Sequence, residues 1–264
     1  MLKPRIIPSL LLCNGELVKT TNFQNPKYVG DPINAVKIFN EKLVDEIMIL
    51  DISATVLNKE PDYDLIKNLA NECRMPICYG GGIKNLSQAL KVFQLGIEKI
   101  AVSSAFIERP ELISELASLV GNQSVVLVLD VKIDSDGFYR IWTNNGSIPT
   151  GLELQNFLLH VKDLGIGEIV INSIDRDGTM TGIDNQIIDI VRNCLQIPHT
   201  ILGGASSLLD IQEVISKYGV IGIGAGSLFV FKGRLRAVLI TYPDPTVKSD
   251  IISEALLNFN SLNG

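Results

Sequence analysis

The stretch from Gly167 to Gly182 reads GEIVINSIDRDGTMTG and carries the main structural signal of the chain. Residues 169–171 are apolar and β-branched, which predicts a buried strand. The polar residues that follow are Asn172, Ser173, Asp175 and Asp177, and Gly178 and Gly182 bracket the loop. A strand that ends in carboxylates and glycines is typical of the catalytic mouth of a parallel α/β enzyme. For this loop alone, the preferred interpretation is an ordinary turn with solvated acids. The rest of the chain is therefore needed to choose between this turn and a catalytic mouth.

Strand and helix patterns alternate along the whole chain, which predicts a parallel sheet built from βα units. The predicted strands are 5–11, 46–51, 76–79, 99–103, 124–130, 169–171, 198–202 and 220–225. The predicted helices are 31–42, 63–73, 86–95, one opened by Pro110, 152–164, 185–194 and 208–218, with 248–264 as a final helix or a frayed tail. Eight units favour a closed (β/α)8 TIM barrel in one domain, residues 1–264, over an open doubly wound sheet.

Two segments interrupt the alternation. Residues 12–30 are predicted to form a long loop that contains Lys19 and Phe23. Residues 132–143 form an insertion, whose Asp136-Gly137 pair predicts a hairpin turn. Asp31-Pro32 predicts an N-cap followed by proline in the first turn of the first helix.

Composition excludes several classes of function. The chain has 264 residues, close to the ~250 of a typical barrel, and its net charge of −6 argues against a nucleic-acid-binding surface. No apolar run approaches the ~20 residues of a membrane span, and the N-terminus lacks a signal-peptide core. The four cysteines show no CxxC spacing and the two histidines, His160 and His199, look like structural filler. We therefore expect a cytoplasmic protein with no metal site, no cofactor and no membrane partner.

The two halves of the chain resemble each other. Residues 46–49 (EIMI) match 168–171 (EIVI), and Gly81-Gly82 matches Gly203-Gly204, both at an offset of 122. Ser104-Ala105-Phe106 matches Ser227-Leu228-Phe229 at an offset of 123. Three matches at nearly one offset predict a duplicated half-barrel with pseudo-twofold symmetry.

The duplicated glycines predict two anion sites. Paired glycines after a strand let backbone N–H groups approach an anion closely, and barrels commonly bind phosphate at the loops after strands seven and eight. Gly204 and Ser227 supply one such site, and Gly82 and Ser104 supply its copy. Two sites across one barrel mouth indicate an elongated ligand with a phosphate at each end. A glycine pair that only serves a tight turn is the alternative for either site alone.

Five motifs, RIIP, GDP, GGGIK, VLDVK and INSIDRDGTMTGID, resemble the cyclase subunit of imidazole glycerol phosphate synthase (the HisF family) over nearly the whole chain. The resemblance implies a (β/α)8 barrel that condenses ammonia with a bisphosphate ribotide in histidine biosynthesis. It also implies a heterodimer with a separate glutaminase subunit, which makes the ammonia and docks on the N-terminal face of the barrel.

The resemblance implies acid–base chemistry by two aspartates, at the ends of strands one and five. The second is Asp130, whereas the first position holds Leu11. Leucine cannot transfer a proton, and the nearby Asp51, Asp175 and Asp177 are the candidates for partial substitution. The expected substrate- and phosphate-binding residues are Lys19, Asp51, Gly82, Ser103, Ser104, Ser173, Asp177, Gly178, Gly204 and Ser227.

A second set of matching residues is intact. Arg5, Glu46, Lys99 and Glu168 stand at the starts of predicted strands one, two, four and six. In the family such residues form a salt-bridged ring that gates the ammonia channel, and two cations with two carboxylates can neutralise one another in a narrow barrel end. For any one of these positions taken alone, the alternative to a gate is an ordinary charged residue near solvent at the start of a strand.

Three hypotheses remain open. The first is that the chain is an ordinary cyclase of histidine biosynthesis in which Asp130 does most of the work. The second is that it is a paralogue that, with a glutaminase, supplies ammonia for amidination of surface-polysaccharide (O-antigen) sugars. The third is that it is a non-catalytic activator of the glutaminase. Leu11 favours the paralogue for the physiological role, while the family activity gives the biochemical class.

Overall fold

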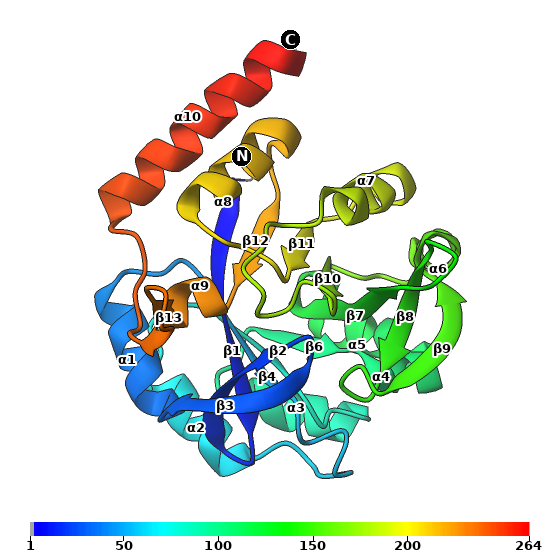
Figure 1. The fold of residues 1–264 in the computed structure, drawn as a ribbon. Coiled ribbons are helices and arrows are strands. Elements are labelled where there is room, and N and C mark those ends of the chain that lie inside the picture. Colours follow the sequence, from blue (N-terminus) through cyan, green and yellow to red (C-terminus); the bar gives the residue numbers. More distant parts are fainter. Residues whose placement is uncertain (1–2, 264) are drawn as a thin grey trace.

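A computed structural model describes residues 3–263, and they form a closed barrel of parallel strands (Figure 1). The barrel strands are β1 (Arg5–Cys13), β4 (Ile47–Asp51), β5 (Ile77–Gly80), β6 (Lys99–Val102), β7 (Val125–Ile133), β10 (Glu168–Ser173), β11 (His199–Leu202) and β12 (Gly222–Ala225). Each strand pairs with the next in this order, including β7 with β10, and β12 pairs with β1 to close the barrel. The closed barrel is confirmed, and the open doubly wound sheet is wrong.

Helices surround the barrel and connect successive strands (Figure 1). They are α1 (Pro32–Glu41), α2 (Tyr63–Glu72), α3 (Leu86–Gln94), α5 (Glu111–Val120), α6 (Leu154–Val161), α7 (Asn185–Cys194), α8 (Leu208–Tyr218) and α10 (Pro245–Asn263). The predicted bounds of α7 and α8 agree with the structure, and the segment from Lys248 is helical up to Asn263, with Gly264 outside the described residues. Asp31 caps α1 as predicted, because its Oδ1 accepts a hydrogen bond from the Asn34 N–H at 2.8 Å.

The predicted loop over residues 12–30 is wrong, because this segment is a β-hairpin. The chain turns at Asn14 and Gly15, both with positive φ (51° and 82°), and continues as β2 (Glu16–Thr21) and β3 (Gln24–Gly30). An Asn-Gly turn with positive φ at both residues matches the twist of the two strands it joins. Barrel strand β1 therefore continues past the barrel mouth into an antiparallel extension.

The second interruption is also antiparallel, as the Asp136-Gly137 turn predicts. Barrel strand β7 pairs with β8 (Tyr139–Thr143), which pairs with β9 (Ile148–Glu153). Smaller additions are the short helices α4 (Ser104–Glu108) and α9 (Ser227–Val230), the 3-10 turn η1 (Asn122–Ser124) and the strand pair β13 (Phe231–Lys232) and β14 (Ala237–Val238). None of the helices described is long and apolar enough to cross a membrane.

Apolar side chains form two separate clusters. The large one lies between the strands and the surrounding helices, with Phe39 and Phe106 among its largest buried members. The small one fills the barrel interior and contains Ile7, Met48, Cys78, Ala101, Val126, Val128, Val170 and Leu202, with Leu50 packed against it. Side chains alternate across a strand, so the barrel strands other than β12 contribute to both clusters, whereas β12 contributes Ile223 and Ala225 to the large one.

The strand register confirms the pseudo-twofold halves. Leu11 is paired with Leu50, and Asp130 with Asn172. Leu50 is then paired with Gly80, and Asn172 with Leu202. The offsets from first half to second are 130 − 11 = 119 for the first strand and 172 − 50 = 122 and 202 − 80 = 122 for the next two. Leu11 and Asp130 therefore occupy equivalent places in the two halves.

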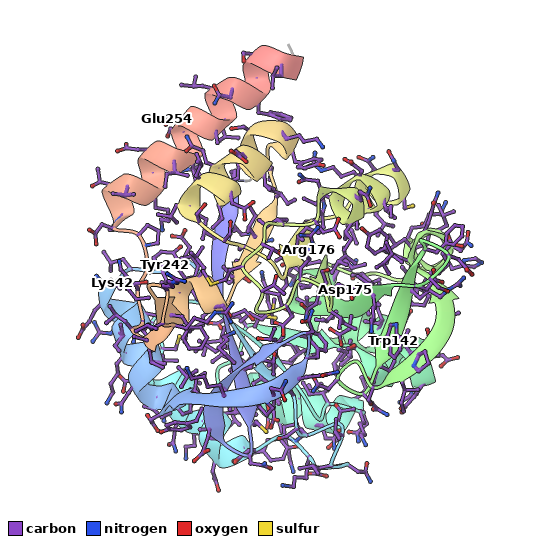
Figure 2. The ribbon with its side chains drawn as sticks, in the orientation of Figure 1. Lys42, Trp142, Asp175, Arg176, Tyr242 and Glu254 are labelled. Atoms are coloured by element: carbon purple, nitrogen blue, oxygen red, sulfur yellow. The ribbon has the colours of Figure 1, made fainter. Side chains whose placement is uncertain are left out.

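Helix α10 is attached to the barrel by polar contacts at its beginning and lies along α8 (Figures 1 and 2). Just before the helix, the buried Tyr242 hydroxyl donates to the Ile6 carbonyl of β1 at 2.9 Å, and its ring lies 5.0 Å from that of Phe229. Lys248 pairs with Asp45 at 2.7 Å, and Gln212 donates to Glu254 at 2.9 Å. These contacts bring the last helix back to the first strand.

Replacing Tyr242 with phenylalanine removes the hydroxyl and leaves the Ile6 carbonyl without its side-chain donor. We expect Tyr242→Phe to lower the free energy of unfolding by about 1–2 kcal/mol, measured by urea denaturation. Tyr28→Phe is the matched control, because Tyr28 is 58% exposed. Equal effects of the two changes would contradict the assigned role of this hydrogen bond.

Candidate active site

A cavity of about 390 Å³ opens at the carboxyl ends of the barrel strands. It collects ten of the predicted site residues: Lys19, Asp51, Gly82, Ser103, Ser104, Asp130, Asp177, Gly178, Gly204 and Ser227. Parallel strands bring these residues together because all their carboxyl ends meet at one face of the barrel.

Ser173 is the predicted substrate-binding residue that does not line the cavity. It is buried at the end of β10, and a Cβ at Gly203 would lie 2.8 Å from its carbonyl oxygen. The Ser173 backbone therefore packs so closely against the Gly203 turn that a side chain at position 203 would not fit.

Asp130 lies at the cavity end of β7 with one amide partner. Asn172 Nδ2 on the neighbouring strand β10 donates to Asp130 Oδ1 at 3.2 Å. Burial raises the pKa of Asp130 to about 7; the Asn172 hydrogen bond opposes this rise and the charge of Asp177 adds to it. A carboxyl group with such a pKa can both accept and donate a proton near neutral pH. Asn172 belongs to the opening motif, but its role becomes visible only through the β7–β10 register.

The two glycine pairs have the backbone conformation that the duplication predicts. Gly81 and Gly82 have φ of 122° and 73°, and Gly203 and Gly204 have φ of 101° and 92°. A Cβ would collide with backbone in each pair, lying 2.5 Å from the Asp51 carbonyl at Gly81 and 2.2 Å from the Gly182 carbonyl at Gly204. Any larger residue would strain these loops, so glycine is required for the close backbone approach.

Lys19 reaches from strand β2 to Gly226, in the loop that follows β12. Its side chain is buried, Nζ donates to the Ser9 carbonyl at 2.7 Å, and a Cβ at Gly226 would lie 2.0 Å from Nζ. Burial lowers the pKa of Lys19 to about 8, while the charge of Asp177 opposes the decrease. A partly charged amine therefore lies beside Gly226 and Ser227, a position suited to an anion.

The tip of the β2–β3 hairpin is fastened to the loop after β10. Asp177 Oδ2 accepts from Thr20 Oγ1 at 2.6 Å and from the Phe23 N–H at 3.2 Å, and the Asn22 N–H donates to the Asp177 carbonyl at 2.9 Å. Thr20 and Phe23 also line the cavity, and sequence reasoning did not select them as site residues. The hairpin covers part of the barrel mouth.

The other two candidate carboxylates are engaged locally. Asp51 Oδ1 accepts from the Ser53 N–H at 2.9 Å, the Ser53 hydroxyl at 2.8 Å and the Ala54 N–H at 3.0 Å. Asp175 Oδ2 accepts from the Ile133 N–H at 2.9 Å, and Asp175 is not among the residues that line the cavity. Figure 2 shows Asp175 beside Arg176 on the loop after β10. Asp175 is thus a poor substitute for a carboxylate at position 11.

Leu11 lines the cavity opposite these polar groups. It is 7% exposed, and its register partner on β4 is Leu50, which also lines the cavity. The first half of the barrel mouth therefore presents two leucines where the second half presents Asp130 and Asn172.

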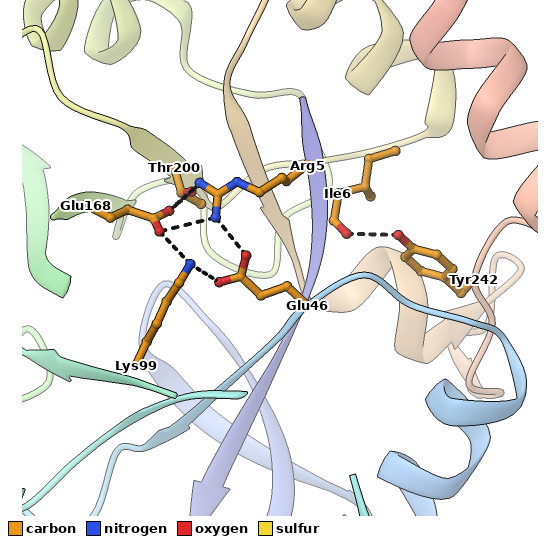
Figure 3. Close-up of polar contacts among 7 residues, drawn as sticks. All are labelled: Arg5, Ile6, Glu46, Lys99, Glu168, Thr200 and Tyr242. Atoms are coloured by element: carbon orange, nitrogen blue, oxygen red, sulfur yellow. Dashed lines mark hydrogen bonds and ion pairs between the residues drawn. The ribbon is translucent and has the colours of Figure 1, made fainter. Parts of the chain in front are cut away.

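The four predicted gate residues meet at the opposite end of the barrel (Figure 3). Arg5 contacts Glu46 at 2.7 Å and Glu168 at 2.6 Å, and Lys99 contacts the same carboxylates at 2.6 and 3.1 Å. Thr200, which sequence reasoning missed, donates to Glu168 Oε1 at 2.6 Å. Burial opposes ionisation of Glu168, but Arg5, Lys99 and Thr200 together hold its pKa at about 2. The four side chains form a charge-balanced closure of the barrel end.

Comparison with known proteins agrees with this geometry. Residues 5–236 match the model of the family described as histidine biosynthesis protein. A Leptospira interrogans protein named "Putative imidazole glycerol phosphate synthase subunit HisF" is 53% identical over 92% of this chain and 96% of its own length. The Streptococcus mutans protein named "Imidazole glycerol phosphate synthase subunit HisF" is 35% identical over 87% of this chain and 91% of its own. The chain belongs to the HisF family.

Other HisF-family relatives carry numbered names. A Vibrio vulnificus protein, "Putative imidazole glycerol phosphate synthase subunit hisF3", is 48% identical over 94% of this chain and 96% of its own length. The match to the histidine biosynthesis protein family covers Asp130, both glycine pairs and the four charged residues of the closure, since all lie within residues 5–236.

The neighbours of Asp130 make its titration testable. Asp177→Asn removes a negative charge that raises the pKa of Asp130, so we expect that pKa to fall below its value of about 7. The measurement is a pH titration of the Asp130 carboxyl carbon by ¹³C NMR. Asp175→Asn, on the same loop but facing Ile133, should leave the titration unchanged. A pKa near 4 in the unsubstituted protein would contradict the burial argument.

Proposed function

We propose that this chain is the ammonia-using synthase subunit of a glutamine-dependent complex, acting on an elongated ligand with a phosphate at each end. The observation that carries the proposal is the arrangement of one barrel with a charge-balanced closure at its amino end and an acid–base carboxyl between two glycine loops at its carboxyl end.

The closure supports ammonia entry from the amino end. The interior between the closure and the cavity is lined by apolar side chains, which hold back ions more strongly than a small uncharged molecule. A glutaminase docked at that end would deliver ammonia into the interior, and the two proteins would form a heterodimer. Arg5, Glu46, Lys99 and Glu168 would then act as the gate.

The cavity supports a ligand with two phosphates. One phosphate would bind at Gly82, Ser103 and Ser104, and the other at Gly204 and Ser227 beside the Lys19 amine. Asp51, Asp177 and Gly178 would contact the ligand between them. In this arrangement the reacting atoms lie over Asp130, which exchanges one proton.

Leu11 limits the cyclisation that HisF-type chemistry requires. Ring closure removes a proton at one centre and delivers a proton at another, and a leucine at position 11 leaves Asp130 without a second carboxyl opposite it. We therefore propose that cyclisation of the histidine-biosynthesis substrate is weak in this protein.

A second candidate function follows from the same leucine. With a glutaminase partner, the chain would supply ammonia to another enzyme, such as one that amidinates surface-polysaccharide sugars. The apolar pair Leu11 and Leu50 at the cavity favours this role, because it suits binding and transit better than acid–base chemistry. A pure activator of the glutaminase would bind the same ligand without converting it.

Restoring the missing carboxyl should raise cyclase activity. Losing one acid–base group typically costs ~10²–10⁴-fold in rate, so we expect Leu11→Asp to recover part of that factor in kcat/KM for the bisphosphate ribotide at saturating ammonium. Full recovery is not expected, because burial raises the pKa of the new carboxyl. Asp130→Asn is the matched control and should abolish the residual rate. An unsubstituted protein with high cyclase activity would contradict the assigned effect of Leu11.

Reversing the charge at position 99 of the closure should uncouple the active site of the glutaminase from that of this chain. Lys99→Glu places a third carboxylate beside Glu46 and Glu168, so we expect glutamine-dependent turnover with the glutaminase to fall at least tenfold while affinity for the bisphosphate is kept. Lys84→Glu lies beside Gly82 at the other end of the barrel. It should weaken ligand binding but leave the glutaminase and the synthase coupled. Unchanged glutamine-dependent turnover in Lys99→Glu would contradict the assignment of these four residues as a gate.

A further inference from the structure

Three segments contact one another at the carboxyl end of the barrel. They are the tip of the β2–β3 hairpin (residues 20–23), the turn after β10 (residues 174–182) and the β13–β14 hairpin (residues 231–238). Asp177 of the turn accepts hydrogen bonds from the Thr20 hydroxyl and the Phe23 N–H of the tip. Lys27 of β3 lies over the ring of Phe231 of β13, with Nζ 5.2 Å from the ring centroid. A third contact, between the turn and the β13–β14 hairpin, completes the set.

Arg236 makes this third contact. Its Nη2 donates to the Gly178 carbonyl at 2.9 Å and to the Thr179 carbonyl at 3.4 Å. These two residues immediately follow Asp177 in the chain. The turn is therefore held from two sides, by the β2–β3 tip at Asp177 and by Arg236 at the next two residues.

Two features of Arg236 call for an explanation. Its φ is 49°, in the left-handed region that a residue other than glycine enters only at a cost in free energy. Arg236 is half-buried and forms no ion pair with a carboxylate of residues 3–263, so the hydrogen bonds of its guanidinium go to the two carbonyls of the turn. Such backbone strain tends to be kept where a residue serves a site.

The turn matters to the site because it carries Asp177. The charge of Asp177 raises the pKa of Asp130 and opposes the decrease in the pKa of Lys19. Interactions between charges weaken with distance, so the place of Asp177 decides how strongly it acts on both groups. Gly178 lines the cavity, and a Cβ at this position would lie 2.0 Å from the Thr20 carbonyl. The turn therefore fits closely against the hairpin, and its position has to be set exactly enough to keep that fit.

We propose that Arg236 is a positioning residue of the active site, which fixes the place of the Asp177 carboxylate by binding the Gly178 and Thr179 carbonyls. The inference deepens the proposed function and rests on it where Asp177 is taken as a ligand contact. The placement itself can be measured on the protein alone, because Asp130 and Lys19 both respond to the charge of Asp177.

The direction of the response separates positioning from direct electrostatics. If Arg236 acted on Asp130 and Lys19 through its own positive charge, removing that charge would raise both pKa values. If Arg236 acts by placing Asp177, its removal frees the carboxylate to move toward water, and both pKa values fall. The two mechanisms therefore predict opposite signs.

Arg236→Met removes the guanidinium and keeps a long unbranched side chain. We expect the pKa of Asp130 to fall below about 7 and that of Lys19 to fall below about 8. The measurement is a pH titration by ¹³C NMR of the Asp130 carboxyl carbon and the Lys19 Cε. Arg234→Met is the matched control, because Arg234 is exposed on the same hairpin and none of the described residues hydrogen-bonds to it. This control should leave both pKa values unchanged.

Arg236→Lys gives a second measurement of the same effect. Lysine keeps the charge but lacks the planar fork that reaches two carbonyls, so we expect a smaller fall of both pKa values in the same direction. This variant decides the question if the methionine variant does not fold.

A double-mutant cycle tests whether Arg236 acts through Asp177. In the Asp177→Asn background the negative charge is already absent, so Arg236→Met should cause no further fall in the pKa of Asp130. An equal fall in that background would overturn the proposal, as would a rise of either pKa in the single variant. Lower thermal stability with unchanged titrations would also overturn it, because Arg236 would then only stabilise its hairpin.

The kinetic counterpart depends on the proposed function. In a turnover assay with the bisphosphate ribotide and saturating ammonium, Arg236→Met should move the acidic limb of the pH profile of kcat/KM to lower pH, since that limb reports Asp130. We also expect KM for the bisphosphate to rise about tenfold, the effect of one weakened ligand contact.

The two proposals fail in different ways. If both pKa values fall in Arg236→Met but the unsubstituted protein converts no bisphosphate, the positioning role stands and the synthase function falls. If turnover is rapid and the titrations are unchanged in Arg236→Met, the synthase function stands and the positioning role falls.

Discussion

A closed eight-stranded barrel has to fill its own interior, and the chemistry of each level along the axis follows from this constraint. Half of the side chains of every barrel strand point inward, into a space that admits few layers. At the amino end, charged residues neutralise one another; in the middle, apolar residues pack; at the carboxyl end, polar residues face the cavity. The site therefore depends on the level that each inward residue occupies.

The two ends of the barrel respond to pH in opposite directions. Glu168 has a pKa of about 2, below its ordinary 4.5, so it stabilises the fold above about pH 4.5, and this contribution is lost as pH falls toward 2. Asp130 has a pKa of about 7, above its ordinary 3.8, so its contribution is fully present below pH 3.8 and is lost as pH rises through 7. The closure is thus a structural ion network, whereas the mouth keeps a carboxyl group at a cost in stability, as functional sites do.

The sequence predicted the barrel because strand and helix periods alternate and because a duplication repeats at nearly one offset. It missed the antiparallel extension formed by β1, β2 and β3, although Asn14-Gly15 at the β1–β2 turn is a strong local turn signal, because a long barrel loop was expected there. The glycine loops were recognisable by their spacing, and the four charged residues of the closure by the resemblance to the HisF family. Asn172 and Thr200 were not, because their contacts with Asp130 and Glu168 come from register across strands distant in the sequence.

The difference between the halves also explains what Leu11 removes. Acid–base pairs work when the environments of the two groups push their pKa values apart. Asp130 has an amide donor in Asn172, whereas position 11 has Leu50 in the equivalent place. A carboxyl group at position 11 would lack that amide and would hold its proton more strongly than Asp130 does. The duplicated frame would then supply an acid on one side and a base on the other. In the function proposed for this chain, leucine at position 11 keeps the frame and the base but removes the acid, so we expect a barrel that holds its ligands better than it closes a ring.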